Sequence, residues 1–76
     1  MTKTKFTATD PRDGQVYTRT SAHAYTFAII VTDSGDGARW AEWASRGDLA
    51  DKAAARWNRR PSGRFAAITL AVDGAA

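Results

Sequence analysis

The sequence predicts one small α+β domain, in which about five strands form an antiparallel or mixed sheet and one helix packs on it, in the order ββββαβ. The chain has 76 residues, which is enough for a single domain (1–76) with a thin core. Short stretches rich in Thr, Val, Phe and Tyr alternate along the chain with turn residues, as strands do. The segment 48–60 instead has apolar residues at helical spacing. Residues 1–3 and 73–76 are expected to fray.

The first two strands are predicted at 5–9 and 16–20, as a hairpin. The segment between them, 10–14, contains Asp, Pro and a final Gly, a combination typical of tight turns. Alternation places Phe6 and Ala8 on one face, and we expect Val16 to join them there. The opposite face is then polar and solvated, and it carries Lys5, Thr7, Thr9 and Arg19.

The third predicted strand, 25–32, is apolar on both faces. Tyr25, Phe27, Ile29 and Val31 share one face, and Ala28 and Ile30 share the other. A strand with two apolar faces is typical of the centre of a sheet that is covered on both sides. One helix covers one face only, so the second face would need a partner or a second copy of the chain. A homo-oligomer is therefore possible.

The segment 39–45 fits either a strand or a short helix. We favour a strand, because the turn residues of 33–37 lie directly between two apolar segments. On a strand, Trp40 and Trp43 point to opposite faces, whereas on a helix they share one.

The helix is predicted at 48–60, with Asp48 as its N-cap. Its apolar stripe comprises Leu49, Ala50, Ala53, Ala54 and Trp57. Pro61 ends the helix, because a residue that precedes proline is pushed out of helical geometry. The last strand is predicted at 64–72.

Composition excludes several kinds of site. The chain has no cysteine and one histidine, so it cannot form a thiolate or multi-histidine metal site. The segment starting at Asp33 lacks the spacing of a calcium loop, and Ser21 with His23 lacks a third group to orient the imidazole. We expect no metal, no cofactor and no catalysis. The longest apolar run, 27–31, is too short to span a membrane.

The basic residues offer the main candidate site. The net charge is +3, and Arg56, Arg59 and Arg60 lie on one side of the end of the predicted helix, with Arg64 close after it. Together they would bind phosphates or an acidic protein surface. Alternatively, they complement the helix dipole and keep the domain soluble. A second candidate is Trp40 with Arg39, since aromatic and basic residues together can stack on bases.

Several short segments are similar to those of a known group of proteins. These segments are 19–21, 25–26, 28–31, 45–46, 48–50 and 52–54. Through them the chain resembles small uncharacterised proteins encoded by bacteriophages of actinobacteria. The resemblance implies a phage accessory protein in the cytoplasm of the host bacterium, and it carries no assigned activity or functional residue.

The resulting expectation is a small, non-enzymatic interaction module that binds a host or phage protein. Its binding residues would be Arg56, Arg59, Arg60 and Arg64, together with Trp40 and Arg39, because Trp and Arg dominate interface energies. The alternative is a nucleic-acid-binding protein that uses the same arginines.

Overall fold

The computed structural model describes residues 3–61 and 63–75 and confirms the small α+β fold. Its elements follow the predicted order, ββββαβ, and a two-residue strand is added at the end. They are β1 (Thr4–Thr9), β2 (Val16–Ser21), β3 (Phe27–Asp33), β4 (Arg39–Ala44), α1 (Gly47–Asn58), β5 (Phe65–Ala71) and β6 (Gly74–Ala75). The segment left open between strand and helix is thus strand β4.

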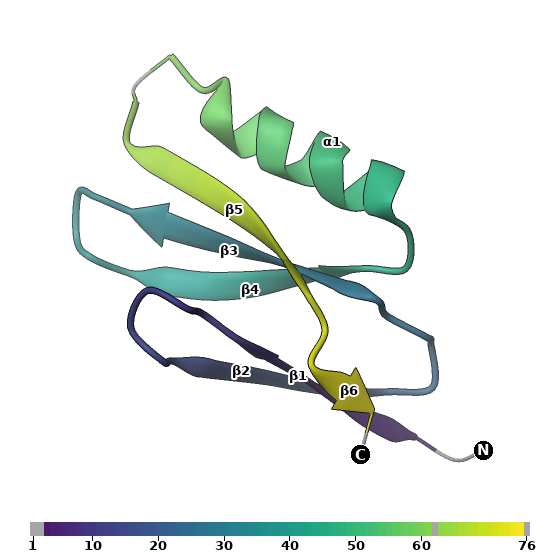
Figure 1. Cartoon of the computed structure of the whole chain (residues 1–76). Helices are drawn as coiled ribbons and strands as arrows, with labels where there is room; N and C mark the ends of the chain where they lie inside the picture. The colour runs from purple at the N-terminus through teal and green to yellow at the C-terminus, as the bar shows by residue number, and fades with distance from the viewer. Residues whose placement is uncertain (1–2, 62, 76) are drawn as a thin grey trace.

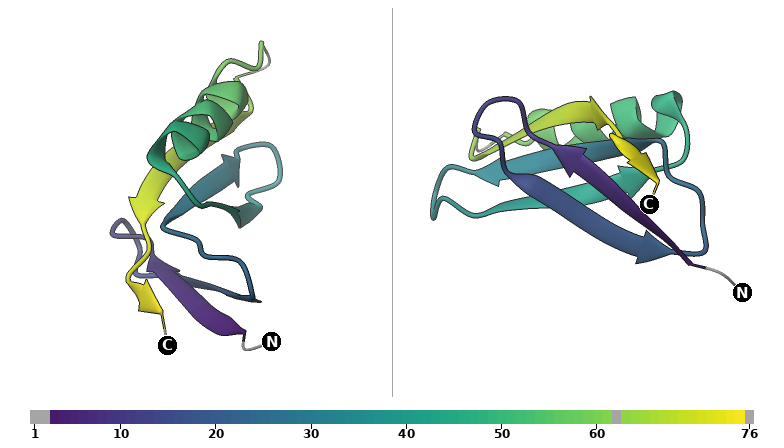
Figure 2. Two further views of the ribbon diagram at one scale, coloured as in Figure 1. Left: turned by 90° about the vertical axis from the view of Figure 1, so that its right-hand side faces the viewer. Right: turned by 60° about the horizontal axis from the view of Figure 1, so that its bottom comes forward.

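The strands form two three-stranded antiparallel sheets rather than one (Figure 1). The upper sheet has the order β4-β3-β5 and carries α1 on one face, and the lower sheet has the order β2-β1-β6. After β5 the chain passes from the upper sheet to the lower (Figure 2, left). There the Val72 N–H donates to Thr26 O (3.0 Å) and the Asp73 N–H donates to Thr7 O (2.8 Å), which ties the two sheets together.

Strand β3 lies at the centre of the upper sheet, and both of its faces are covered, as its sequence predicts. Towards α1, Ile29 and Val31 pack in a core with Ala50 and Ala54 of the helix. Towards the lower sheet, Ala28 and Ile30 form a second core with Ala8 of β1. The second face is therefore covered by the chain's own N-terminal hairpin, so covering it requires no second copy.

The predicted faces of the β1–β2 hairpin are right for β1 and wrong for β2. Phe6 and Ala8 are buried, but Val16 is 52% exposed. The observed register pairs Ala8 with Tyr17 and Phe6 with Arg19, so Tyr17 and Arg19 lie on the same face as Ala8 and Phe6, although Arg19 is exposed as expected. The length of the turn sets this register, and a shift of one residue reverses every side chain of a strand.

Four smaller expectations also differ from the structure. Tyr25 precedes β3 and packs near Phe6 and Trp43, on the side opposite Phe27. The N-cap of α1 is Arg46, and Asp48 lies in the first turn. Leu49 is 39% exposed. The expected frayed tail forms β6 instead, paired with β1, while residues 1–2 and 76 lie outside the described residues.

Candidate functional site

The predicted basic residues lie at the C-terminal end of α1 and in the loop that leads to β5. Arg56 belongs to the last helical turn, and Arg59 is the C-cap residue. Both are exposed, and within residues 3–61 and 63–75 neither side chain forms a hydrogen bond or an ion pair. Their guanidinium groups are thus available to a partner.

Arg60 is held in place by aromatic rings. Its guanidinium carbon lies 4.4 Å from the ring centroid of Trp57 and 5.5 Å from that of Phe65. These two rings and Trp40 form the aromatic cluster, with centroid separations of 5.0 to 6.2 Å. The Trp57 indole N–H donates to the carboxylate of Glu42. Because the stacking covers only the face of the guanidinium, its N–H groups remain directed outward along its edge.

Arg64 does not join the other three arginines as a free cation. Its Nε donates to Asp33 Oδ1 at 2.5 Å, and its guanidinium lies 5.6 Å from the ring centroid of Phe65. The Arg64 side chain lowers the pKa of Asp33, and Asp33 raises the pKa of Arg64. Arg64 therefore fastens the start of β5 to the β3–β4 turn, and Arg56, Arg59 and Arg60 constitute the basic end.

Charge is strongly segregated along the chain. The segment 52–64 holds five of the eleven Lys and Arg residues and none of the eight Asp and Glu residues. It therefore carries a formal charge of +5, while the rest of the chain carries −2. The modest net charge of the whole sequence conceals this separation.

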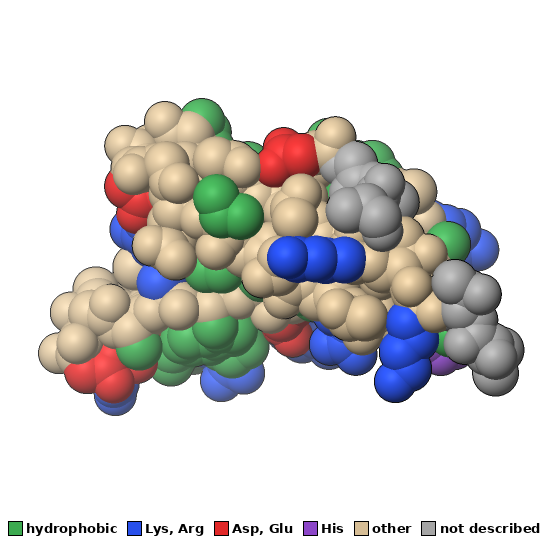
Figure 3. Space-filling view, turned by 90° about the horizontal axis from the view of Figure 1, so that it is seen from below, with side chains coloured by type: hydrophobic (Ala, Val, Ile, Leu, Met, Phe, Trp, Pro, Cys, Tyr) green, Lys and Arg blue, Asp and Glu red, His purple; other side chains and the backbone are tan. Residues whose placement is uncertain are grey.

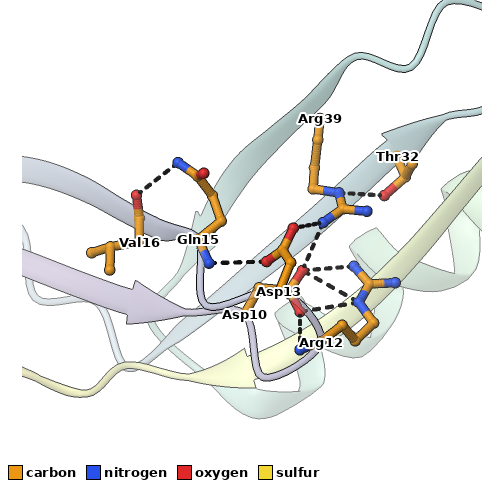
Figure 4. A network of polar contacts seen from close by, with 7 residues as sticks. All are labelled: Asp10, Arg12, Asp13, Gln15, Val16, Thr32 and Arg39. Carbon is orange, nitrogen blue, oxygen red and sulfur yellow. Dashed lines mark hydrogen bonds and ion pairs between the residues drawn. The ribbon is translucent and has the colours of Figure 1, made fainter.

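Arg39 and Trp40 do not form one site, because they project from opposite faces of β4. Trp40 packs in the aromatic cluster under α1. Arg39 points towards the β1–β2 turn, where its Nη1 donates to the carboxylate of Asp13 and lies 3.4 Å from Asp10 Oδ2 (Figure 4). Its Nε donates to Thr32 Oγ1 at 3.1 Å. Trp43 packs towards the lower sheet, so the two tryptophans build no common platform.

Sequence reasoning missed the polar network around Asp10. This carboxylate is fully buried and accepts hydrogen bonds from the backbone N–H (2.9 Å), Nε (3.0 Å) and Nη2 (2.8 Å) of Arg12. These bonds outweigh the cost of burial and lower its pKa to about 2. The spacing Asp-x-Arg inside a turn is the only sequence signal for this contact.

A polar hollow of about 380 Å³ lies beside this network, between the β1–β2 and β3–β4 turns. It is lined by Asp13, Gln15, Tyr17, Gly37 and Arg39. Both sheets therefore contribute to its walls.

Ser21 and His23 do not form a nucleophile–base pair in the structure. The Ser21 hydroxyl accepts the backbone N–H of His23 at 3.0 Å, which is a local turn contact. Among the described residues, no group of three or more His, Cys, Asp or Glu side chains is placed to hold a metal ion.

The comparisons with known proteins give no match: no family model, no curated protein and no solved structure is similar to this chain. In the part of the chain that the structure describes, no helix is long and apolar enough to span a membrane.

Proposed function

We propose that this protein is a small, non-enzymatic interaction module that binds an acidic surface of a partner protein through its basic end. In line with the resemblance to phage proteins, the partner would be a host or phage protein in the cytoplasm of an actinobacterium. The observation that carries the proposal is the stacking of Arg60 on Trp57 beside two arginines that have no partner in the described chain.

This arrangement suits a protein partner for an energetic reason. A free arginine loses side-chain entropy when it binds, but Arg60 is already restrained by two rings. A planar guanidinium forms paired hydrogen bonds with a carboxylate. Trp and Arg are also the residue types that dominate binding energy in protein interfaces. The basic end thus offers one restrained guanidinium group, that of Arg60, and two flexible ones, those of Arg56 and Arg59.

Nucleic-acid binding is the second candidate, and the charge of segment 52–64 favours it. The aromatic rings argue against base stacking, because Trp57 is covered by Arg60 and Trp40 packs edge-on against Trp57. Binding would therefore rest on phosphate contacts alone, and the affinity would fall steeply with salt. Three neutralised phosphates correspond to a slope of about −3 in log K against log salt concentration.

The test is affinity capture from an actinobacterial extract, with and without nuclease, using the native protein and the double variant Arg56→Glu/Arg59→Glu. We expect the native protein to retain a discrete protein after nuclease treatment, and the variant to retain at least about tenfold less of it, because two attractive charges become repulsive. Lys3→Glu/Lys5→Glu is the matched control, since it changes the net charge equally near the N-terminus, which lies at the other end of the molecule (Figure 1).

Three results would reject the proposal. One is equal capture by the native protein and the basic-end variant. Another is an equal loss in both charge variants, which would indicate a nonspecific effect of net charge. The third is capture that disappears on nuclease treatment, which would indicate that the basic end binds nucleic acid rather than a protein.

A further inference from the structure

The edge strands of the two sheets differ in whether their outward main-chain groups have hydrogen-bond partners. An edge strand leaves main-chain N–H and C=O groups without a neighbouring strand. At β5 the side chain of Asn58 replaces that neighbour: its Nδ2 donates to Ala67 O (3.1 Å), and its Oδ1 accepts the Ala67 N–H (2.8 Å). A residue of α1 thereby satisfies both main-chain groups of Ala67 at this edge.

The outer edge of β2 has no such closure. The Asp10 N–H donates to Gln15 O at 2.9 Å, so residues 10 and 15 form a hydrogen-bonded pair. Such pairs alternate along an antiparallel ladder, and therefore Val16, Thr18 and Thr20 direct their main-chain groups away from β1. Within residues 3–61 and 63–75, the only hydrogen bond to these groups runs from Gln15 Nε2 to Val16 O, at 3.5 Å.

The outer edge of β4 is open as well. The Asp33 N–H donates to Ala38 O at 2.8 Å, and the same alternation directs the main-chain groups of Arg39, Ala41 and Trp43 away from β3. In the described part of the chain, no hydrogen bond reaches these outward groups.

The two open edges flank the same hollow. Tyr17 of β2 and Arg39 of β4 both line it. Behind it, Tyr17, Ala41 and Trp43 are only half-buried and pack on the lower core. Seen from below, hydrophobic side chains lie in a recess between two projections at one end of the molecule (Figure 3). The outward main-chain groups of β2 and β4 are thus exposed beside partly exposed apolar side chains.

The topology leaves room for one more strand. All pairings are antiparallel, so along the order β2, β1, β6–β5, β3, β4 the two outermost strands run in the same direction. A segment antiparallel to both would continue the alternation.

We infer that the recess between β2 and β4 binds an extended segment of a partner protein, which adds a strand to both sheets. Charge complementarity defines the segment further. Arg19 projects from β2 on the side of the lower core, 5.3 Å from the Tyr25 ring centroid, and pairs with no carboxylate among the described residues. A segment antiparallel to β2 places its N-terminal half at Arg19. It therefore carries an acidic residue there and apolar residues between Tyr17 and Trp43.

The test begins with a displayed library of random 12-residue peptides, selected on the native protein. Enriched peptides are expected to carry an acidic residue before an alternating apolar stretch. Synthetic copies should bind Thr18→Pro at least about fivefold more weakly, which corresponds to one lost main-chain hydrogen bond. Proline removes only an outward N–H at this position, so the fold is expected to tolerate it. Thr18→Val retains the N–H and should bind like the native protein.

Backbone amide NMR on the native protein provides a second measurement that does not depend on a variant folding. The bound peptide should shift and protect the amides of Thr18 and Thr20 in β2 and of Ala41 and Trp43 in β4. Arg56→Ala/Arg59→Ala should bind the peptide as the native protein does, which separates this surface from the basic end. The inference is overturned if no peptide is enriched, if Thr18→Pro and Thr18→Val bind equally, or if the shifts fall on the basic end.

Discussion

Single residues decide how the turns hold the two sheets together. Asp10 is a buried carboxylate whose charge is balanced by Arg12 from its own turn and by Arg39 from β4. It therefore links the β1–β2 turn to the upper sheet as well as shaping the turn itself. At the other turn, Asp33 holds Arg64 at the start of β5, a contact within the upper sheet.

Asp10→Asn should be clearly destabilising, because a neutral amide cannot match the charge-assisted hydrogen bonds from Arg12. We expect a loss of about 2 kcal/mol in the free energy of unfolding, measured by urea denaturation. Asp36→Asn is the matched control, because Asn can still accept the Ala38 N–H at this exposed turn. Equal stability of the two variants would contradict the structural role of Asp10.

Acid should destabilise the protein through these same carboxylates. The pKa of Asp10 falls from 3.8 to about 2 in the folded state, and the pKa of Asp33 is also lowered. A lowered folded-state pKa stabilises the protein above pH 3.8, and that stabilisation is lost as the pH falls towards the folded value. The free energy of unfolding should be flat from about pH 7 to 5 and fall between about pH 4 and 2.

Urea titrations at each pH unit measure this profile. Asp10→Asn should reduce the steepness of the acid limb, because one of the responsible groups is gone. A native protein whose stability rises below pH 4, or a variant with an unchanged limb, would contradict the assignment.

At the scale of elements, the sequence predicted β1 to β5 and the helix, but it predicted neither β6 nor how the elements face one another. The periodicity of β3 and α1 is local, and both have the predicted apolar faces at Ile29, Val31, Ala50 and Ala54. The face of β2 depends on the length of its turn, and the Val16 prediction therefore failed. Residues that act across sequence distance, such as Asn58 at Ala67, leave no local pattern at all.

Asn58→Ala should both destabilise the protein and open the edge of β5. Two hydrogen bonds to Ala67 are lost, and we expect a cost of roughly 1–2 kcal/mol in the free energy of unfolding. The Ala67 amide should also exchange its hydrogen faster. Arg56→Ala, at an exposed helical site, should change neither quantity measurably. An unchanged Ala67 exchange rate in Asn58→Ala would show that the side chain does not close this edge.

At the scale of the molecule, the upper sheet lies between the two cores, and its central strand β3 supplies buried residues to both. Ile29 and Val31 face the helix, while Ala28 and Ile30 face the lower sheet. Ile30→Ala should therefore cost roughly 2–4 kcal/mol and weaken both layers together. Tryptophan fluorescence, far-UV circular dichroism and amide exchange should report one coincident unfolding transition. Loss of the β1–β2 hairpin at lower urea than the helix would contradict a shared core.

The candidate site was only partly predictable for the same reason. Helical spacing brings Arg56, Arg59 and Arg60 together, and the structure places them at one end of α1. The pairing of Arg64 with Asp33 joins residues 31 positions apart, so nothing local reveals that this fourth arginine is engaged. Arg39 and Trp40 are neighbours in sequence but lie on opposite faces of a strand, which separates them in space.

The most direct test of the proposed function is site-specific photo-crosslinking in an actinobacterial extract, with p-benzoylphenylalanine replacing Arg56 or, as the comparison, Lys5. If the basic end binds a protein, position 56 should give one discrete, nuclease-resistant crosslinked protein band, which is absent at position 5 and competed by unmodified protein. The contrary result is a band at position 5 alone, the same bands at both positions, only nucleic-acid adducts, or no crosslink at position 56.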